Sequence, residues 1–115
     1  MSTFQNYILG NWMTGDGVET KLFHAVTNAE IGSVSSAGID YEQVLDYGRK
    51  TGGRALRKMT FQERGRMLKA LALFLMERKD RYYEVSSWTG ATKVDSWIDI
   101  EGGIGNLFAN ASLRK

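Results

Sequence analysis

The sequence predicts an α+β fold in which short N-terminal β-hairpins are followed by about four helices. Residues up to about Gly38 are rich in Gly, Thr, Asn and Ser and carry short apolar segments, which is typical of strands joined by turns. From Asp40 onward, apolar residues recur at helical spacing and no proline interrupts them. We therefore treat residues 1–115 as a single domain, with a β-hairpin region at 1–38 and a helical region at 40–112.

Two hairpins are expected in the first region, each with a turn between two short strands. The turn pairs are Gly10-Asn11 and Asn28-Ala29, which contain residue types that readily adopt positive φ values. The flanking strands are 7–9 with 12–14, and 20–26 with 31–35. Ribbons of this length are marginal in water unless another element packs on them.

The first helix is predicted to begin at Asp40. Its carboxylate accepts an early backbone N–H, and the side chain of Gln43 reaches back, as in a capping box. We expect this helix to stop at residues 51–53, where Thr-Gly-Gly follows, and a short turn to occupy residues 55–58.

The second helix has a better capping box, formed by Thr60 and Glu63. Its apolar face is predicted to consist of Met67, Leu68, Leu71, Phe74 and Leu75. Helical composition continues beyond it with a bend near Lys79, and the last helix is expected to start near Thr92 or Asp95.

Three glycines, at 102, 103 and 105, lie inside the last predicted helix. Each should cost about 1 kcal/mol relative to alanine in an exposed helix interior. Close packing of another backbone against this face is the expected reason for them. Residues 103–108 also begin like a dinucleotide-binding glycine loop, but Phe108 replaces the third glycine and a helical pattern precedes them where a strand is needed, so we reject that interpretation.

Composition narrows the function classes. The absence of cysteine excludes a disulfide framework, a thiolate metal site and a thiol nucleophile within this sequence. The first residues lack the basic and apolar segments of a secretory signal, and the longest apolar run, residues 70–76, is too short to span a bilayer. A cytoplasmic location without membrane association is the prediction.

Basic residues concentrate between Arg49 and Lys69, a segment that contains eight of them and a single acid, Glu63. Such a block can attract nucleic acid or a phosphorylated cofactor through its field. The solvated side of helices is the favoured interpretation, and we do not expect nucleic acid as the main partner. The alternative function is a small helical binding module that uses this basic block, residues 49–69, on nucleic acid or another anionic partner.

Few side chains are candidates for chemistry. His24, the one histidine, has no acid or nucleophile near it in sequence and is interpreted as a half-buried structural residue. Asp95 and Asp99 share a helical face, with Glu101 nearby, and paired carboxylates can serve as acid and base. The favoured role is electrostatic stabilisation of the helix N-terminus. The scattered tryptophans and tyrosines, which can stack on bases, are interpreted as core residues.

Residues 90–108 resemble the fourth helix of aldehyde dehydrogenases, and other segments follow in the order of that family. The matching segments are residues 7–12 (I-x-G-x-W), 23–32 (P-x-T-G-E-x-I), 59–64 (S-x-x-E-R) and 88–90 (E-T-G-K). The usual proline of the second segment is absent, and Thr-Gly-Ala-Thr at 89–92 replaces T-G-K-P. Residues 95–104 are similar to a subgroup acting on CoA-linked semialdehydes in aerobic aromatic catabolism, including phenylacetate degradation.

The resemblance implies an N-terminal fragment of an NAD(P)-dependent oxidoreductase, forming the outer part of its nucleotide-binding domain. In that family a cysteine thiolate attacks the aldehyde, hydride leaves for NAD or NADP, and water hydrolyses the thioester. None of those positions falls in this chain. We therefore assign no catalytic or cofactor-binding residue, and expect no cofactor and no activity for the chain alone. The implied partners are the remainder of the parent enzyme, its aldehyde substrate and, for the isolated chain, a second copy.

One site of the family is represented. Many members hold a monovalent cation with an acid at the position of Asp99 and with carbonyl oxygens at the positions of His24 and Ala25. Hard cations prefer such oxygen ligands. The resemblance therefore implies Asp99 as a cation ligand.

Overall fold

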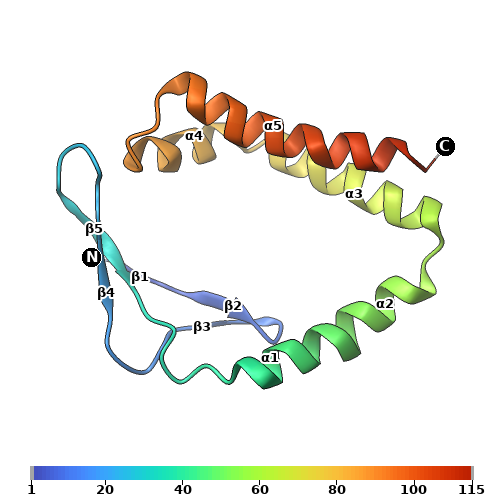
Figure 1. Ribbon diagram of the computed structural model, residues 1–115, viewed down its shortest axis with the longest axis horizontal. Coiled ribbons are helices and arrows are strands. Elements are labelled where there is room, and N and C mark those ends of the chain that lie inside the picture. The colour runs from blue at the N-terminus through green and yellow to red at the C-terminus, as the bar shows by residue number, and fades with distance from the viewer. Residues whose placement is uncertain (1, 115) are drawn as a thin grey trace. The chain divides into compact units, whose positions relative to one another are not determined.

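The computed structural model describes residues 2–114 and divides the chain into two compact units, Met1–Ala55 and Leu56–Lys115. Short strands are followed by helices, which confirms the predicted α+β class (Figure 1). The division falls inside the helical region and not at the predicted junction of strands and helices. None of the helices in the described part has the length and apolarity that a bilayer crossing requires.

The first hairpin forms one residue earlier than predicted. Strands β2 (Asn6–Ile8) and β3 (Asn11–Met13) are antiparallel, and Ile8 pairs with Asn11. The turn residues are therefore Leu9 and Gly10, with φ values of 52° and 78°, and the predicted Gly10-Asn11 turn is wrong. Two positive φ values in succession are required by the type of turn that matches the twist of a tight hairpin.

The second strand pair is confirmed and belongs to a three-stranded sheet. Strands β4 (Thr20–Phe23) and β5 (Glu30–Val34) are antiparallel, with a register shift between Leu22 and Phe23. Strand β1 (Thr3–Phe4) pairs with β5 in parallel, so the order is β1-β5-β4. The sequence did not predict β1, because two residues carry no periodic signal.

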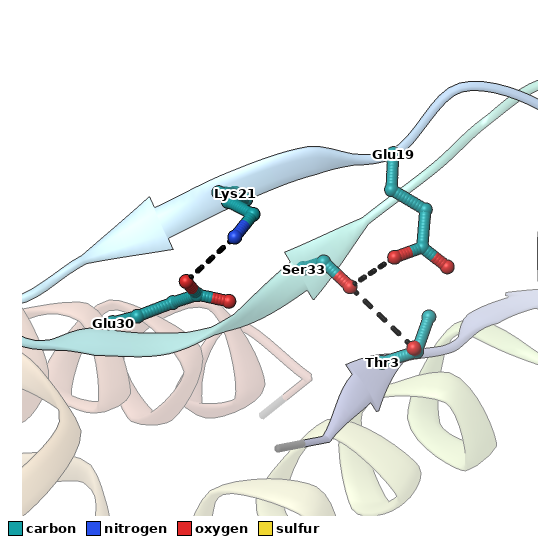
Figure 2. A network of polar contacts seen from close by, with 5 residues as sticks. All are labelled: Thr3, Glu19, Lys21, Glu30 and Ser33. Atoms are coloured by element: carbon teal, nitrogen blue, oxygen red, sulfur yellow. Dashed lines mark hydrogen bonds and ion pairs between the residues drawn. The ribbon is translucent and has the colours of Figure 1, made fainter.

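Polar contacts hold this sheet together (Figure 2). The buried Ser33 hydroxyl donates to Glu19 Oε2 at 2.7 Å and lies 3.4 Å from Thr3 Oγ1, so one side chain of β5 contacts residues on both sides. Lys21 and Glu30 form an ion pair of 2.9 Å between β4 and β5. Lys21 is exposed and Glu30 is half-buried, so water screens the pair and it contributes at most about 1 kcal/mol.

The start of the first helix was predicted correctly. Asp40 Oδ1 accepts the backbone N–H of Gln43 at 3.0 Å, and helix α1 covers Tyr41–Tyr47. The reciprocal half of the expected capping box, from the Gln43 side chain to the Asp40 N–H, does not form among residues 2–114.

The predicted end of that helix is wrong. A widened π-helical segment, η1 (Gly48–Gly52), follows α1, and helix α2 (Gly53–Lys58) continues from it. Gly48 and Gly53 take helical φ values of −58° and −61°, so neither acts as a left-handed stop signal. The residues expected to form a turn at 55–58 are therefore helical.

The described part of the second unit contains three complete helices, after the last residues of α2. They are α3 (Phe61–Met76), α4 (Lys79–Trp88) and α5 (Lys93–Ser112). Both predicted starts are confirmed, because Thr60 with Glu63 and Thr92 with Asp95 each form a complete capping box. The break between α3 and α4 lies at residues 77 and 78, beside the predicted bend at Lys79.

Helix α3 packs on α5 through small residues. Gly65 and Ala72 of α3 are buried, as are Ile104 and Ala111 of α5. A Cβ added at Gly65 would lie 3.2 Å from the carbonyl oxygen of Ala111, which shows how closely the backbones approach.

The predicted apolar face of α3 is only partly correct. Leu68 and Leu75 are half-buried, whereas Met67, Leu71 and Phe74 are exposed. The small residues next to α5 determine which face is covered, and the large apolar residues lie to one side of it. The expectation that the aromatic residues form a core is also wrong, since Trp12 and Trp97 are 65% and 55% exposed.

Candidate functional site

A pocket of about 570 Å³ lies between α4 and α5 of the second unit. Its lining residues are Lys79, Asp80, Tyr83, Glu84, Ser87, Ala91, Lys93, Ser96 and Glu101. The pocket is mostly polar in residue type and contains charges of both signs. It is therefore the natural place to look for chemistry in the described chain.

Glu101 is the central residue of this pocket. Its Oε1 accepts hydrogen bonds from Lys79 Nζ at 3.1 Å and from the Tyr83 hydroxyl at 2.9 Å. Lys79 and Tyr83 lie one turn apart on α4, so they approach the same carboxylate of α5 from one helix face. Deeper between the helices, the hydroxyls of Ser86 and Ser96 are 2.8 Å apart.

These bonds determine the charge states of the groups. The hydrogen bond from Lys79, together with that from Tyr83, holds the pKa of Glu101 below its ordinary value. Partial burial and the hydrogen bond to Glu101 raise the pKa of Tyr83. At neutral pH the carboxylate is charged and the phenol is a neutral donor. The group therefore serves as a structural clamp between the helices, because a general base would need a pKa closer to neutral pH.

Sequence reasoning missed this cluster. It singled out Glu101 only as a neighbour of Asp95 and Asp99, and it did not consider Lys79 or Tyr83 as partners. The four-residue spacing of Lys79 and Tyr83 was a usable signal, since residues so spaced share one helix face.

Asp95 is hydrogen-bonded at the N-terminus of α5. Asp95 Oδ2 accepts from the hydroxyl of Thr92 at 2.6 Å and from its backbone N–H at 3.1 Å, and these bonds lower the pKa of Asp95. The electrostatic interpretation therefore applies to Asp95, which completes a capping box. Asp99 is exposed further along α5.

Asp99 borders an open hollow of about 410 Å³ whose other lining residues are Asp95, Ile98, Gly102, Gly103 and Asn106. Among residues 2–114, no three or more His, Cys, Asp or Glu side chains are grouped to hold a metal ion. His24 and Ala25 lie in the first unit and Asp99 in the second. The cation role of Asp99 therefore stays a prediction.

His24 has the structural role expected of it. It follows directly after β4 and is half-buried, and its Nδ1 accepts the backbone N–H groups of Val26 and Thr27 at 3.1 and 3.3 Å. Its backbone N–H donates to the carbonyl of Ala29 at 2.8 Å. The imidazole thus orders the turn between β4 and β5.

The basic block is a solvent-exposed surface. Its eight side chains, Arg49, Lys50, Arg54, Arg57, Lys58, Arg64, Arg66 and Lys69, are all exposed. Lys50 forms a 2.6 Å ion pair with Asp46, one turn earlier in the helical run. The block extends over both units.

The glycines of α5 do not form a nucleotide site. Residues 103–108 lie inside a continuous helix, whereas a pyrophosphate site requires a strand, a glycine turn and a helix N-terminus in that order. These glycines therefore do not form the turn that a dinucleotide site requires. Beyond the adjacent residues and the backbone of α5 itself, no described heavy atom lies within 4 Å of a Cβ built on Gly102, Gly103 or Gly105. The described residues therefore do not supply the close packing expected at these positions.

A known dehydrogenase is similar to most of this chain. No family model matches the chain. Over 100 residues, or 86% of its length, the chain is 37% identical to a 3,4-dehydroadipyl-CoA semialdehyde dehydrogenase from Aromatoleum evansii. This similarity confirms the resemblance to aldehyde dehydrogenases. The matched segment is 19% of that aldehyde dehydrogenase, so the chain spans about a fifth of the length of this relative.

Proposed function

We propose that this chain is the N-terminal portion of an NAD(P)-dependent aldehyde dehydrogenase that oxidises a CoA-linked semialdehyde of aromatic catabolism to the acid. The observation that carries the proposal is the 37% identity over 86% of the chain to a CoA-semialdehyde dehydrogenase. The exposure of large apolar residues on α3 and α5 supports it, because a larger protein would cover them.

The chemistry of the proposed enzyme would come from other sequence. This chain has no cysteine to serve as the thiol nucleophile, and its α5 glycines do not fit a dinucleotide. We therefore propose that it is inactive alone and binds neither NAD nor NADP. Its contribution to the enzyme would be structural, as the outer part of the nucleotide-binding domain, with Asp99 as a monovalent cation ligand.

The remaining proposals concern partners and setting. The proposed partners are the rest of the parent polypeptide, with its aldehyde substrate, and a second copy when the chain is alone. Phenylacetate degradation is the proposed pathway, and the cytoplasm the proposed compartment. The absence of a membrane-spanning helix in the described residues is compatible with that setting.

An activity assay tests the enzyme proposal. The chain and a longer polypeptide encoded by the same reading frame are each incubated with 3,4-dehydroadipyl-CoA semialdehyde and either NAD+ or NADP+, and reduction is followed by absorbance. The chain alone should give no reduction, while the longer polypeptide should reduce one or both cofactors. Activity of the 115-residue chain, or a longer frame without a cysteine, would contradict the proposal.

The exposed basic block favours one second candidate, a helical module that binds nucleic acid. A fluorescent single-stranded oligonucleotide titrated with the chain tests it by anisotropy. Counterion release predicts that affinity falls steeply as salt is added, with a slope set by the number of phosphates neutralised. Binding that is absent at low salt would exclude this candidate.

A further inference from the structure

A continuous helical run leads the chain from the first unit into the second, through α1, η1 and α2 (Figure 1). At the end of η1 the backbone N–H of Gly53 donates to the carbonyl of Gly48, five residues earlier, which is the hydrogen bond of a π-helix and not of an α-helix. Sharp bends in helices arise at few features, among them π-bulges and pairs of glycine or serine. This run has both, because Gly52 and Gly53 are adjacent.

The packing around η1 does little to hold it in one conformation. None of the residues 41–58, all of which the structure describes, is buried. Beyond the adjacent residues and the helix backbone, a Cβ built on Gly48 or Gly52 would meet no described heavy atom within 4 Å. An ion pair of 2.6 Å joins Lys50 to Asp46, but both side chains are exposed, and exposed pairs contribute little.

The glycines also lower the intrinsic helical stability of this segment. Apart from proline, glycine is the least favourable residue in a helix interior, because its backbone loses the most conformational freedom there. Short helices owe most of their stability to tertiary packing, and η1 has no buried residue. The start of α1 is better held, since Asp40 caps it and a Cβ built on Gly10 would lie 2.9 Å from the Tyr47 hydroxyl oxygen. Opening of the run should therefore begin at η1.

We propose that η1 is a hinge at which the helical run bends. In the bent state the hydrogen bond from Gly53 to Gly48 is broken and water takes its place, while α1 keeps its cap at Asp40. The exposed glycines accept the φ values that a bend requires without a steric cost. Hinge motions of this kind occur in microseconds to milliseconds. The hinge is a property of this chain and does not depend on the proposed enzyme activity.

A pair of spin labels on the run tests the hinge, and the chain has no native cysteine that would take up a label elsewhere. Glu42→Cys and Arg57→Cys place the labels at exposed positions of α1 and α2, about 22 Å apart along a straight helix. Pulsed electron paramagnetic resonance should give a broad distribution of distances that extends below the straight-helix value. Val94→Cys with Ala109→Cys has the same spacing within α5 and should give a single narrow distance.

Alanine at the hinge glycines should remove the bend. Gly48→Ala with Gly52→Ala raises the helix propensity at two positions that have room for a Cβ, so the distances between the labels on the run should narrow to the width of the α5 pair. Gly102→Ala with Gly105→Ala makes the same change at two equally open glycines of α5 and serves as the matched control. It should leave the distribution from the run unchanged.

Hydrogen exchange distinguishes a hinge from melting of the whole run. After correction for intrinsic rates, the amide of Gly53 should exchange at least about tenfold faster than that of Val44, which donates to Asp40 within α1. The alanine pair at 48 and 52 should slow exchange at Gly53 at least about tenfold. A run as narrow in distance as the α5 pair, a breadth that the hinge alanines leave unchanged or that both alanine pairs reduce equally, or equal exchange at Gly53 and Val44 would overturn the proposal.

Discussion

The phenolic hydroxyl of Tyr83 donates a 2.9 Å hydrogen bond to Glu101 Oε1 and so joins α4 to α5. Lys79 Nζ reaches the same oxygen at 3.1 Å. A short helix of ten residues has little helical stability of its own, so it depends on tertiary contacts of this kind. This clamp is the main polar link between the two helices, together with the contact between the hydroxyls of Ser86 and Ser96.

The clamp makes stability depend on pH at both extremes. The pKa of Glu101 is lowered in the folded chain, so its stabilising contribution is complete above the ordinary glutamate range and is lost as pH falls through the lowered value. The pKa of Tyr83 is raised above 10.0, so its contribution is complete below that pH and is lost as pH rises through the raised value.

Thermal melts followed by circular dichroism should therefore show that Glu101→Gln lowers the melting temperature at neutral pH. The same substitution should reduce the fall in melting temperature that occurs as the pH is lowered. Part of that fall at low pH should persist, because the pKa values of Glu63 and Asp95 are also lowered by their capping hydrogen bonds. Glu84→Gln, at an exposed carboxylate lining the same pocket, is the matched control. If both variants kept the full fall in melting temperature at low pH, the role given to Glu101 would be wrong.

The capping boxes should have measurable energies. Thr60→Ala removes the hydroxyl that accepts the Glu63 N–H at 3.1 Å, and Thr92→Ala removes the corresponding bond to Asp95 at 3.2 Å. Each should lower the free energy of unfolding by about 1 kcal/mol, as measured by urea titration. Thr51→Ala, at an exposed threonine inside η1, is the control and should change little. A cost at Thr51 equal to that at Thr60 would contradict the assignment.

Two glycines should respond oppositely to alanine. Gly102 is open, so Gly102→Ala should stabilise the isolated chain by about 0.5–1 kcal/mol through helix propensity. At Gly65 the new Cβ would lie 2.7 Å from Arg114 Cβ, so the clash should cancel or reverse that gain. Urea unfolding of the two variants measures the difference.

The same glycine substitution also tests the proposed parent enzyme. In a longer, active polypeptide, a backbone packed against α5 would make Gly102→Ala destabilising, which is a change of sign. Stabilisation of equal size in both polypeptides would show that nothing packs closely on Gly102.

The turn after β4 should loosen when its histidine is removed. His24→Ala leaves the N–H groups of Val26 and Thr27 without their shared acceptor, so hydrogen exchange at these two amides should accelerate. Because both amides are exposed, the loss of stability should be small, about 0.5 kcal/mol. The amide of Asn28 donates to a backbone carbonyl and serves as an internal control. Unchanged exchange at all three would remove the structural role of His24.

The features that the sequence predicted well are local in the chain. The capping residues at 60 and 63, and at 92 and 95, are three positions apart, so both halves of each box are visible in one short segment. The bend near Lys79 and the turn at Asn28 were likewise local. The hairpin at Leu9 shifted by one residue because cross-strand pairing, and not the glycine alone, set the turn.

The features that were missed depend on neighbours distant in sequence. Gly52 can either end a helix or take part in a widened π-helical turn, because glycine accepts both conformations. The conformation of the whole segment 41–58 decides between them. The buried side of α3 follows Gly65 and Ala72 because α5 approaches there. The spacing of Lys79 and Tyr83 shows that they share a face of α4, but their partner Glu101 lies on another helix, so spacing alone could not identify it.

The small residues that close α3 against α5 have a calorimetric consequence. Ala72 and Ala111 are the most completely enclosed apolar residues of the described chain, and no large side chain there is enclosed to the same degree. The increase in heat capacity on unfolding grows with the apolar area that becomes exposed to water. The enthalpy of unfolding grows with the extent of packing in the folded state. The isolated chain should therefore have a shallow stability curve, and its melting should be spread over a broad interval of temperature.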